Sequence, residues 1–80
     1  MTQNQTQETF ILNEIASLVD PQVNAFRNVA RTAIAINFAR AGFEIYGKGM
    51  PKFNARVKAL IDAGKVVRSV KGKNTYYTLP

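Results

Sequence analysis

The sequence contains no cysteine, no histidine and no tryptophan among its 80 residues. Without cysteine, a disulfide framework, a thiolate metal site and a thiol nucleophile are excluded. Without histidine as well, the chain lacks the usual zinc ligands and the commonest general base near neutral pH. Most of the standard parts of an enzyme active site are therefore missing.

Phosphate-binding and acid–base motifs are missing too. Gly42, Gly47 and Gly49 do not form the Gly-x-x-x-x-Gly-Lys-Ser/Thr pattern of a phosphate-binding loop. The five acidic residues are scattered, with no pair at a spacing typical of general acid–base work or divalent-metal binding. We therefore expect no enzyme activity, no cofactor and no metal site.

Acidic residues are also scarce in one part of the chain. Residues 1–26 carry three acids and no base, whereas residues 27–80 carry all eleven bases and only Glu44 and Asp62. The net charge is +6 and the isoelectric point is about 10.1. A folded chain with this split attracts polyanions at one end, and phosphate backbones are the first expectation, ahead of anionic membrane surfaces.

Long hydrophobic runs are absent as well. The most apolar stretch, Val29 to Phe43, is interrupted by Arg31, Asn37 and Arg40, and it does not have the pattern of a membrane span. Met1 to Phe10 lacks the basic start and apolar run of a signal peptide. We expect a cytoplasmic, nucleoid-associated protein that forms one small domain and has no membrane partner.

The hydrophobic pattern predicts a polar, flexible tail over residues 1–7, followed by a single domain over residues 8–80. It predicts helices over residues 8–19, 21–41 and 51–63, because apolar residues recur there at helical spacing and because proline or glycine marks several of the ends. A short strand over 43–46 precedes a glycine turn. Residues 65–70 and 75–79 are rich in β-branched and aromatic residues, and they predict a hairpin closed by residues 71–74.

The C-terminal part resembles a known superfamily. The run from Asn54 to Arg68, then Lys71-Gly72-Lys73, then Tyr76-Tyr77-Thr78-Leu79, resembles the recognition helix and wing of winged helix-turn-helix DNA-binding domains. The resemblance covers residues 51–79 and implies an α+β winged-helix fold, three helices followed by a C-terminal β-hairpin. One departure is the Gly42–Met50 connection, which is longer than the usual tight turn between the second and third helices.

The third helix offers a face opposite its apolar stripe, where two alanines allow close approach to a major groove. We expect this face to comprise Lys52, Asn54, Ala55, Arg56, Lys58 and Ala59. The turn before the third helix, the hairpin and the residues beside it add basic side chains and an amide that can hold phosphates. These residues are Lys48, Lys65, Arg68, Lys71, Lys73 and Asn74. An ordinary surface helix and solubilising hairpin lysines are the plain structural alternatives.

Side chains on the last strand alternate in direction, so only one of two adjacent tyrosines can face the core. We expect Tyr77 and Leu79 inward with Val66, and Tyr76 outward beside the wing, where it could touch a phosphate or stack on an unpaired base. On the second helix, Arg27 and Arg31 either extend the phosphate surface or pair with Glu14 or Glu8, and we favour the pairing.

Double-stranded DNA is the expected partner, and a small transcriptional regulator of the phage or mobile-element type is the expected role. A protein-interaction module on an acidic host factor is an alternative, as is an RNA-binding component of a ribonucleoprotein. A homodimer through an apolar strip containing Val29 and Ile36 is compatible with any of these.

Overall fold

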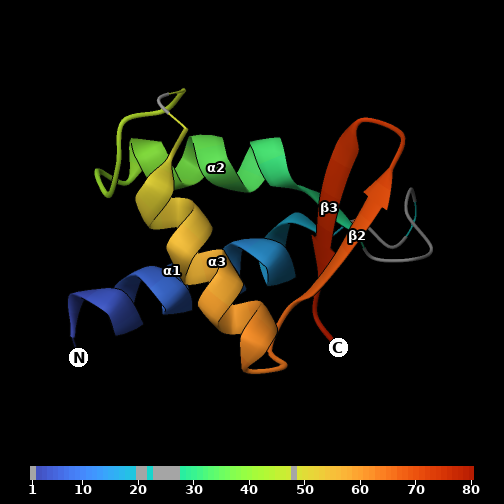
Figure 1. The fold of residues 1–80 in the computed structure, drawn as a ribbon, viewed down its shortest axis with the longest axis horizontal. Helices are drawn as coiled ribbons and strands as arrows, with labels where there is room; N and C mark the ends of the chain where they lie inside the picture. Colours follow the sequence, from blue (N-terminus) through green and yellow to red (C-terminus); the bar gives the residue numbers. More distant parts are fainter. Residues whose placement is uncertain (1, 20–21, 23–27, 48) are drawn as a thin grey trace.

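A computed structural model describes residues 2–19, 22, 28–47 and 49–80. Three helices and a small antiparallel sheet make up this α+β domain (Figure 1). In chain order the elements are α1 (Gln3–Leu18), β1 (Val29–Ala30), α2 (Arg31–Arg40), α3 (Pro51–Asp62), β2 (Val67–Lys71) and β3 (Asn74–Thr78). The β2–β3 hairpin stands at one end of the molecule, opposite the N-terminal end of α1 (Figure 1).

Helix α1 begins five residues earlier than expected. Thr2 and Gln5 form a capping box, in which the Thr2 hydroxyl accepts from the Gln5 N–H at 3.1 Å and the Gln5 side chain accepts from the Thr2 N–H at 2.9 Å. The two bonds satisfy amide groups that the first turn leaves without helical partners. The prediction of an irregular tail is therefore wrong for residues 3–7, and Gln7 is buried beside Ile11 and Ile15.

The second helix is shorter than predicted. Val29 and Ala30, expected inside a helix over 21–41, instead pair with Tyr77 and Tyr76 of β3, and α2 begins only at Arg31. Pairing with β3 places the β-branched Val29 in the core, which outweighs its position in a helical pattern. Residues 20, 21 and 23–27, which belong to the rest of that prediction, lie outside the described residues. The helix ends as predicted, with Ala41 as its C-cap and Gly42 at φ +90°.

The strand predicted over residues 43–46 does not form. Gly42 and Gly47, both at positive φ, bound a bent segment in which Ile45 is 73% exposed. Glu44 in this segment accepts hydrogen bonds from the backbone N–H groups of Lys52 (2.6 Å) and Phe53 (3.1 Å). The segment therefore folds so that one carboxylate caps the start of α3, where a negative charge is favoured by the helix dipole.

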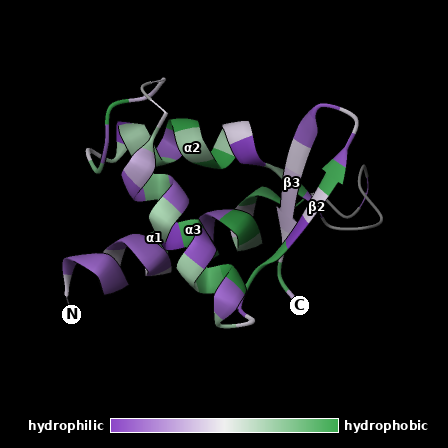
Figure 2. Cartoon of the chain, in the orientation of Figure 1, coloured by the Kyte–Doolittle hydropathy of each residue, from purple (hydrophilic) through white to green (hydrophobic). Residues whose placement is uncertain are grey.

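Helix α3 confirms the predicted apolar stripe. Phe53, Val57 and Leu60 are buried, and Pro51 occupies the first turn as expected. Figure 2 shows the resulting alternation of hydrophobic and hydrophilic residues along this helix. The helix ends at Asp62, close to the predicted boundary, and Gly64 follows at φ +74°.

The hairpin forms with a tighter loop than expected. Strands lie in the order β1-β3-β2, and Lys71 pairs with Asn74, so only Gly72 and Lys73 remain in the loop. The register places Tyr77 opposite both Val29 and Arg68. Residues directly opposite in antiparallel strands share one face of the sheet, so Arg68 lies on the face that carries the buried Tyr77.

The core joins the helices to the inner face of the sheet. Phe38 and Phe53 are fully buried in it, and the partly buried Phe10 and Phe43 pack against it, with ring centroids 5.0–6.2 Å apart in the contacts that link the four rings. Tyr77 and Val66 are buried as predicted, whereas Leu79 is 39% exposed, so its predicted place in the core is wrong. In the part of the chain that the structure describes, no helix has both the length and the apolar character needed to cross a bilayer.

Candidate nucleic-acid interface

The residues that the sequence placed on one face of α3 divide between two sides of the helix. Lys52, Ala55 and Arg56 line a hollow of about 270 Å³ with residues from the start of α1, and we call this side the α1 flank. Asn54 and Lys58 line a different hollow, toward the hairpin, and we call that side the hairpin flank. Ala59 is half-buried.

Arg56 is held by an acid on the α1 flank. Its Nη1 donates to Glu8 Oε2 at 3.0 Å, and the two side chains are only 23% and 26% exposed. This pair joins α3 to α1 across 48 residues of sequence. Arg56 was predicted to face the groove, but its charge is neutralised and its side chain is turned toward α1.

Lys65 also belongs to the α1 flank. It lines a hollow of about 240 Å³ with Glu8, Leu12 and Leu60. Its predicted place beside the hairpin bases is therefore wrong, because the turn after α3 directs it toward α1. Lys48, another predicted phosphate contact, lies outside the described residues.

The hairpin flank contains an open cleft of about 400 Å³ between α3 and the hairpin, which we call the arginine cleft. Its walls come from α2, α3, β2 and β3, and they comprise Arg31, Asn54, Val57, Lys58, Ile61, Arg68, Thr75 and Tyr77. Three of these side chains are cationic. No carboxylate of the described residues lines the cleft.

Arg31 is the most constrained of the three cations. Its Nη2 donates to Asn54 Oδ1 at 2.7 Å, and its guanidinium carbon lies 5.2 Å from the centroid of the Phe53 ring. Asn54 is itself fixed, because its Nδ2 donates to the Gly49 carbonyl at 2.8 Å. Asn54 thus orients an arginine and closes the turn before α3, roles that the sequence did not suggest.

Arg68 and Lys58 are more exposed. Arg68 lies opposite Tyr77 in the hairpin register and lines the cleft, while its phosphate contact stays a prediction. Lys58 donates to Asp62 at 3.1 Å across one helical turn, with side-chain exposures of 77% and 65%. An ion pair this exposed contributes little and leaves Lys58 available to another anion.

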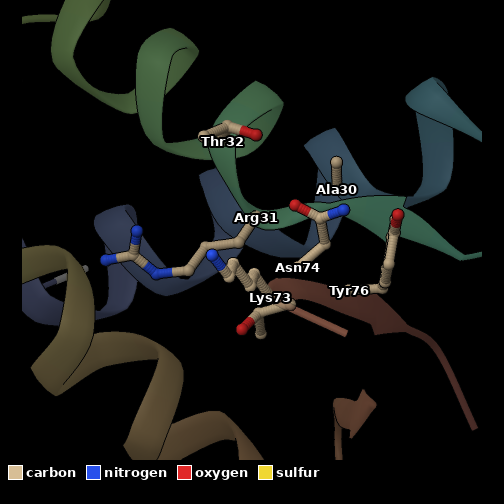
Figure 3. Close-up of a pocket in the computed structure, with 7 residues that line it drawn as sticks. Ala30, Arg31, Thr32, Lys73, Asn74 and Tyr76 are labelled. Carbon is tan, nitrogen blue, oxygen red and sulfur yellow. The ribbon is translucent and has the colours of Figure 1, made fainter. Parts of the chain in front are cut away.

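A second hollow of about 330 Å³ lies on the other side of Arg31, between the start of α2 and the hairpin loop. Figure 3 shows Lys73 and Asn74 reaching toward the start of α2, while the Arg31 side chain extends away from them. Tyr76 lines this hollow and is half-buried, on the opposite sheet face from Tyr77 as predicted. Lys71 and Lys73 are exposed. Arg31 therefore separates two hollows, each of which has lysine on its rim.

Three of the described glutamates have partners away from the cleft, while Asp62 is paired with Lys58 at its edge. Glu8 pairs with Arg56, Glu14 accepts from Asn37 Nδ2 at 2.9 Å, and Glu44 caps α3. The predicted pairing of Arg31 with Glu8 or Glu14 is therefore wrong, since both acids have other partners. Arg27 lies outside the described residues.

Tyr77 lies beneath the arginines. Burial raises the pKa of its hydroxyl above the ordinary 10.0, and the nearby Arg31 and Arg68 charges oppose the rise, Arg31 also by hydrogen bonding. Two positive groups therefore act on one buried hydroxyl at the base of the cleft.

Sequence reasoning missed Arg31 as a central residue of this site. Its position depends on the pairing of β1 with β3, which joins residues almost fifty positions apart. The local pattern gives no sign of that pairing. Val29 is buried by the same pairing, so it is not part of an exposed apolar strip. The predicted dimer through this strip stays a prediction, and Val29 is not available to it.

Comparison of the chain with protein-family profiles, with curated proteins and with solved structures finds no match.

Proposed function

We propose that this protein binds double-stranded DNA, with α3 and the β2–β3 hairpin against the duplex. The observation that carries the proposal is the arginine cleft, where Arg31, Lys58 and Arg68 converge without a carboxylate of the described residues in its lining. Clustered cations repel one another, and an anionic partner relieves that cost. The hairpin extends the cationic surface with Lys71 and Lys73.

The architecture supports this choice. The element order, three helices with a short strand before α2 and a C-terminal hairpin, and the sheet order β1-β3-β2 are compatible with a winged helix. In that arrangement α3 lies in the major groove and the hairpin lies along the backbone. A helix about 10–12 Å across fits a groove about 12 Å wide when its outer residues are small.

The solvent-exposed side of α3 suits entry of the helix into a major groove. It carries Ala55 and the Lys58–Asp62 pair, and these side chains are exposed. Ala55 allows close contact and can touch a thymine methyl group. Arg56 is left out of the proposed interface because Glu8 holds it. Lys58 is then the cationic side chain of α3 best placed for the groove.

The start of α3 is not a phosphate contact in the proposal. Glu44 accepts from the Lys52 and Phe53 N–H groups there, and its carboxylate would repel a phosphate. Phosphate contacts in the proposal therefore come from side chains of the hairpin flank, namely Arg31, Arg68, Lys71 and Lys73. A small transcriptional regulator of the phage or mobile-element type, associated with the nucleoid, is the role we propose for this DNA-binding domain.

Selection from a random duplex pool at two salt concentrations, with sequencing of the retained fraction, tests the proposal. We expect retention that falls steeply with salt and an enriched sequence motif, since α3 presents base-reading groups and the hairpin presents phosphate-binding groups. Single-stranded RNA of equal length is the matched competitor. Preferential retention of RNA, or no retention of duplex at low salt, contradicts the proposal.

A protein partner is the second candidate. Ile45, Tyr46 and Val70 are exposed by 73%, 49% and 59%, and Ile45 and Tyr46 are neighbours in the α2–α3 connection. Exposed apolar side chains of this kind are typical of contact surfaces. Binding to host proteins that persists at high salt and is lost in an Ile45→Ser, Tyr46→Ser variant favours this function over DNA binding.

A further inference from the structure

We infer that the arginine cleft holds one phosphate group of the DNA backbone between the guanidinium groups of Arg31 and Arg68. The inference rests on the proposed function for the identity of the ligand. The proposed function draws its phosphate contacts from the whole hairpin flank, and the inference narrows two of them, Arg31 of α2 and Arg68 of β2, to one shared site for a single phosphate.

Arg31 has the features of a pre-positioned phosphate ligand. Its guanidinium group is bonded to Asn54 Oδ1 at 2.7 Å and lies over the Phe53 ring at 5.2 Å, so its orientation is set before an anion arrives. One bond to Asn54 leaves other N–H donors of the fork free for oxygen acceptors. A ligand-binding group that is already ordered loses little conformational freedom on binding.

The position of Arg31 is otherwise unfavourable. It is the first residue of α2, whose N-cap Ala30 has no side-chain cap and whose first turn carries no acid. The helix dipole disfavours a cation at this end. Within the described residues no carboxylate forms an ion pair with Arg31, and its contacts to Asn54 and the Phe53 ring are with uncharged groups. A bound phosphate compensates the charge.

Arg68 provides the second half of the site. It stands opposite Tyr77 in the sheet, on the face that borders the cleft, and no described carboxylate pairs with it. Arg31, Arg68 and Tyr77 line the same cleft, so the two arginine side chains border one space. Phosphate oxygens match the planar fork of arginine, and two forks can share one phosphate.

The remaining walls favour an anion at this point. Val57 and Ile61 present apolar surface, which reduces competing hydration, and the Thr75 side chain adds a hydroxyl at the cleft. Lys58 stands at the rim. Electrostatic attraction to an anion is stronger beside apolar walls than where both charges are fully hydrated.

The side-chain Nε–H signals of the arginines in the wild-type protein test the site directly. We expect the Arg31 and Arg68 signals to shift when either a short DNA duplex or inorganic phosphate is added, while the Arg40 signal does not move. Arg40 is a matched reference, because it lies at the opposite end of α2 and is exposed.

Variants supply the energetic test. Arg31→Gln is expected to weaken duplex binding about tenfold and to reduce the slope of log affinity against log salt by about one, the value for one lost phosphate contact. Arg31→Lys keeps the charge but loses the fork, and we expect binding about three- to tenfold weaker than wild type. Arg40→Gln, with the same charge change, is expected to stay within about twofold. Circular dichroism and the melting temperature report whether each variant is folded.

The outcomes separate this inference from the proposed function. If the duplex binds but the Arg31 and Arg68 signals do not move, and Arg31→Gln behaves like Arg40→Gln, the phosphate site is refuted and DNA binding stands. If inorganic phosphate shifts both signals but no duplex binds, the anion site is supported while DNA binding is refuted. If Arg31→Lys binds the duplex as tightly as wild type, the planar guanidinium group is not needed, and the positive charge alone accounts for the contribution of Arg31.

Discussion

The two flanks of α3 carry similar cations in different surroundings. On the α1 flank, Arg56 is half-buried and paired with Glu8 at 3.0 Å, so its charge is used inside the domain. On the hairpin flank, Arg31 is fixed by Asn54 and Phe53, which are uncharged, and its charge is left for a partner. Whether a basic residue is a candidate for anion binding therefore depends on its counterions, and its place in a basic stretch of sequence is not sufficient.

The hairpin flank is expected to lose the most when both of its arginines are changed. Arg31→Gln combined with Arg68→Gln removes two charge-assisted contacts, each equivalent to about tenfold in affinity, so we expect duplex binding to fall about 100-fold. Fluorescence anisotropy with a labelled duplex at fixed salt measures the change. A loss of less than about fivefold would remove the arginine cleft from the interface.

Two pairs of lysines compare the flanks at equal charge. Lys71→Ala with Lys73→Ala is expected to weaken binding about tenfold on every sequence and to lower the salt slope by up to about two. Lys52→Ala with Lys65→Ala makes the same change of charge on the α1 flank, where Lys52 lines a hollow with Arg56, and Lys65 one with Glu8. We expect the second pair to change the slope by less than about half a unit. If both double variants change the salt slope by the same amount, the two flanks do not differ in their contact with DNA.

Arg56→Gln is expected to lower the stability of the domain and to leave DNA affinity nearly unchanged. Because Arg56 bonds Glu8 in a half-buried position, its loss is expected to reduce the free energy of unfolding by about 1 kcal/mol and to leave duplex affinity within about twofold. Urea denaturation and the anisotropy assay give the two values. Glu8→Gln is the matched variant and should lower stability by a similar amount. A large loss of affinity with unchanged stability would return Arg56 to the interface.

The smallest expected effect is a change in alkaline stability. Burial raises the pKa of Tyr77 in the folded protein above 10.0, its ordinary value, so the neutral hydroxyl is favoured by folding. This contribution is fully present below pH 10.0 and is lost as the pH rises through the folded-state pKa. The stability advantage of wild type over Tyr77→Phe should therefore shrink above about pH 10, as measured by urea denaturation. An advantage that grows with pH would contradict the direction of the shift.

Local signals predicted much of the fold. Phe53, Val57 and Leu60 lie at helical spacing and are buried as expected, and the Gly72 turn sits between two β-rich runs that do pair. The start of α1 was also readable, because Thr2 and Gln5 have capping-box spacing, but the polar composition of this segment suggested a tail.

The non-local features could not be predicted. Val29 pairs with Tyr77, and Glu8 pairs with Arg56, each across nearly fifty residues. These contacts decide where α2 begins and which cations remain available. Helical periodicity placed Arg31 on a polar face and suggested Glu8 or Glu14 as its partner, whereas the pairing of β1 with β3 brings it to Asn54 and Tyr77. The candidate site was therefore predicted as a basic region, and its division into two flanks was not.

Backbone amide signals of the ¹⁵N-labelled protein, recorded during titration with a duplex taken from the selected pool, test the central claim most directly. We predict that the amide signals of Arg31, Lys58, Arg68, Lys71 and Lys73 shift progressively, while those of Gln7, Arg56 and Lys65 do not move. Shifts concentrated on the α1 flank, with the hairpin flank unchanged, would contradict it.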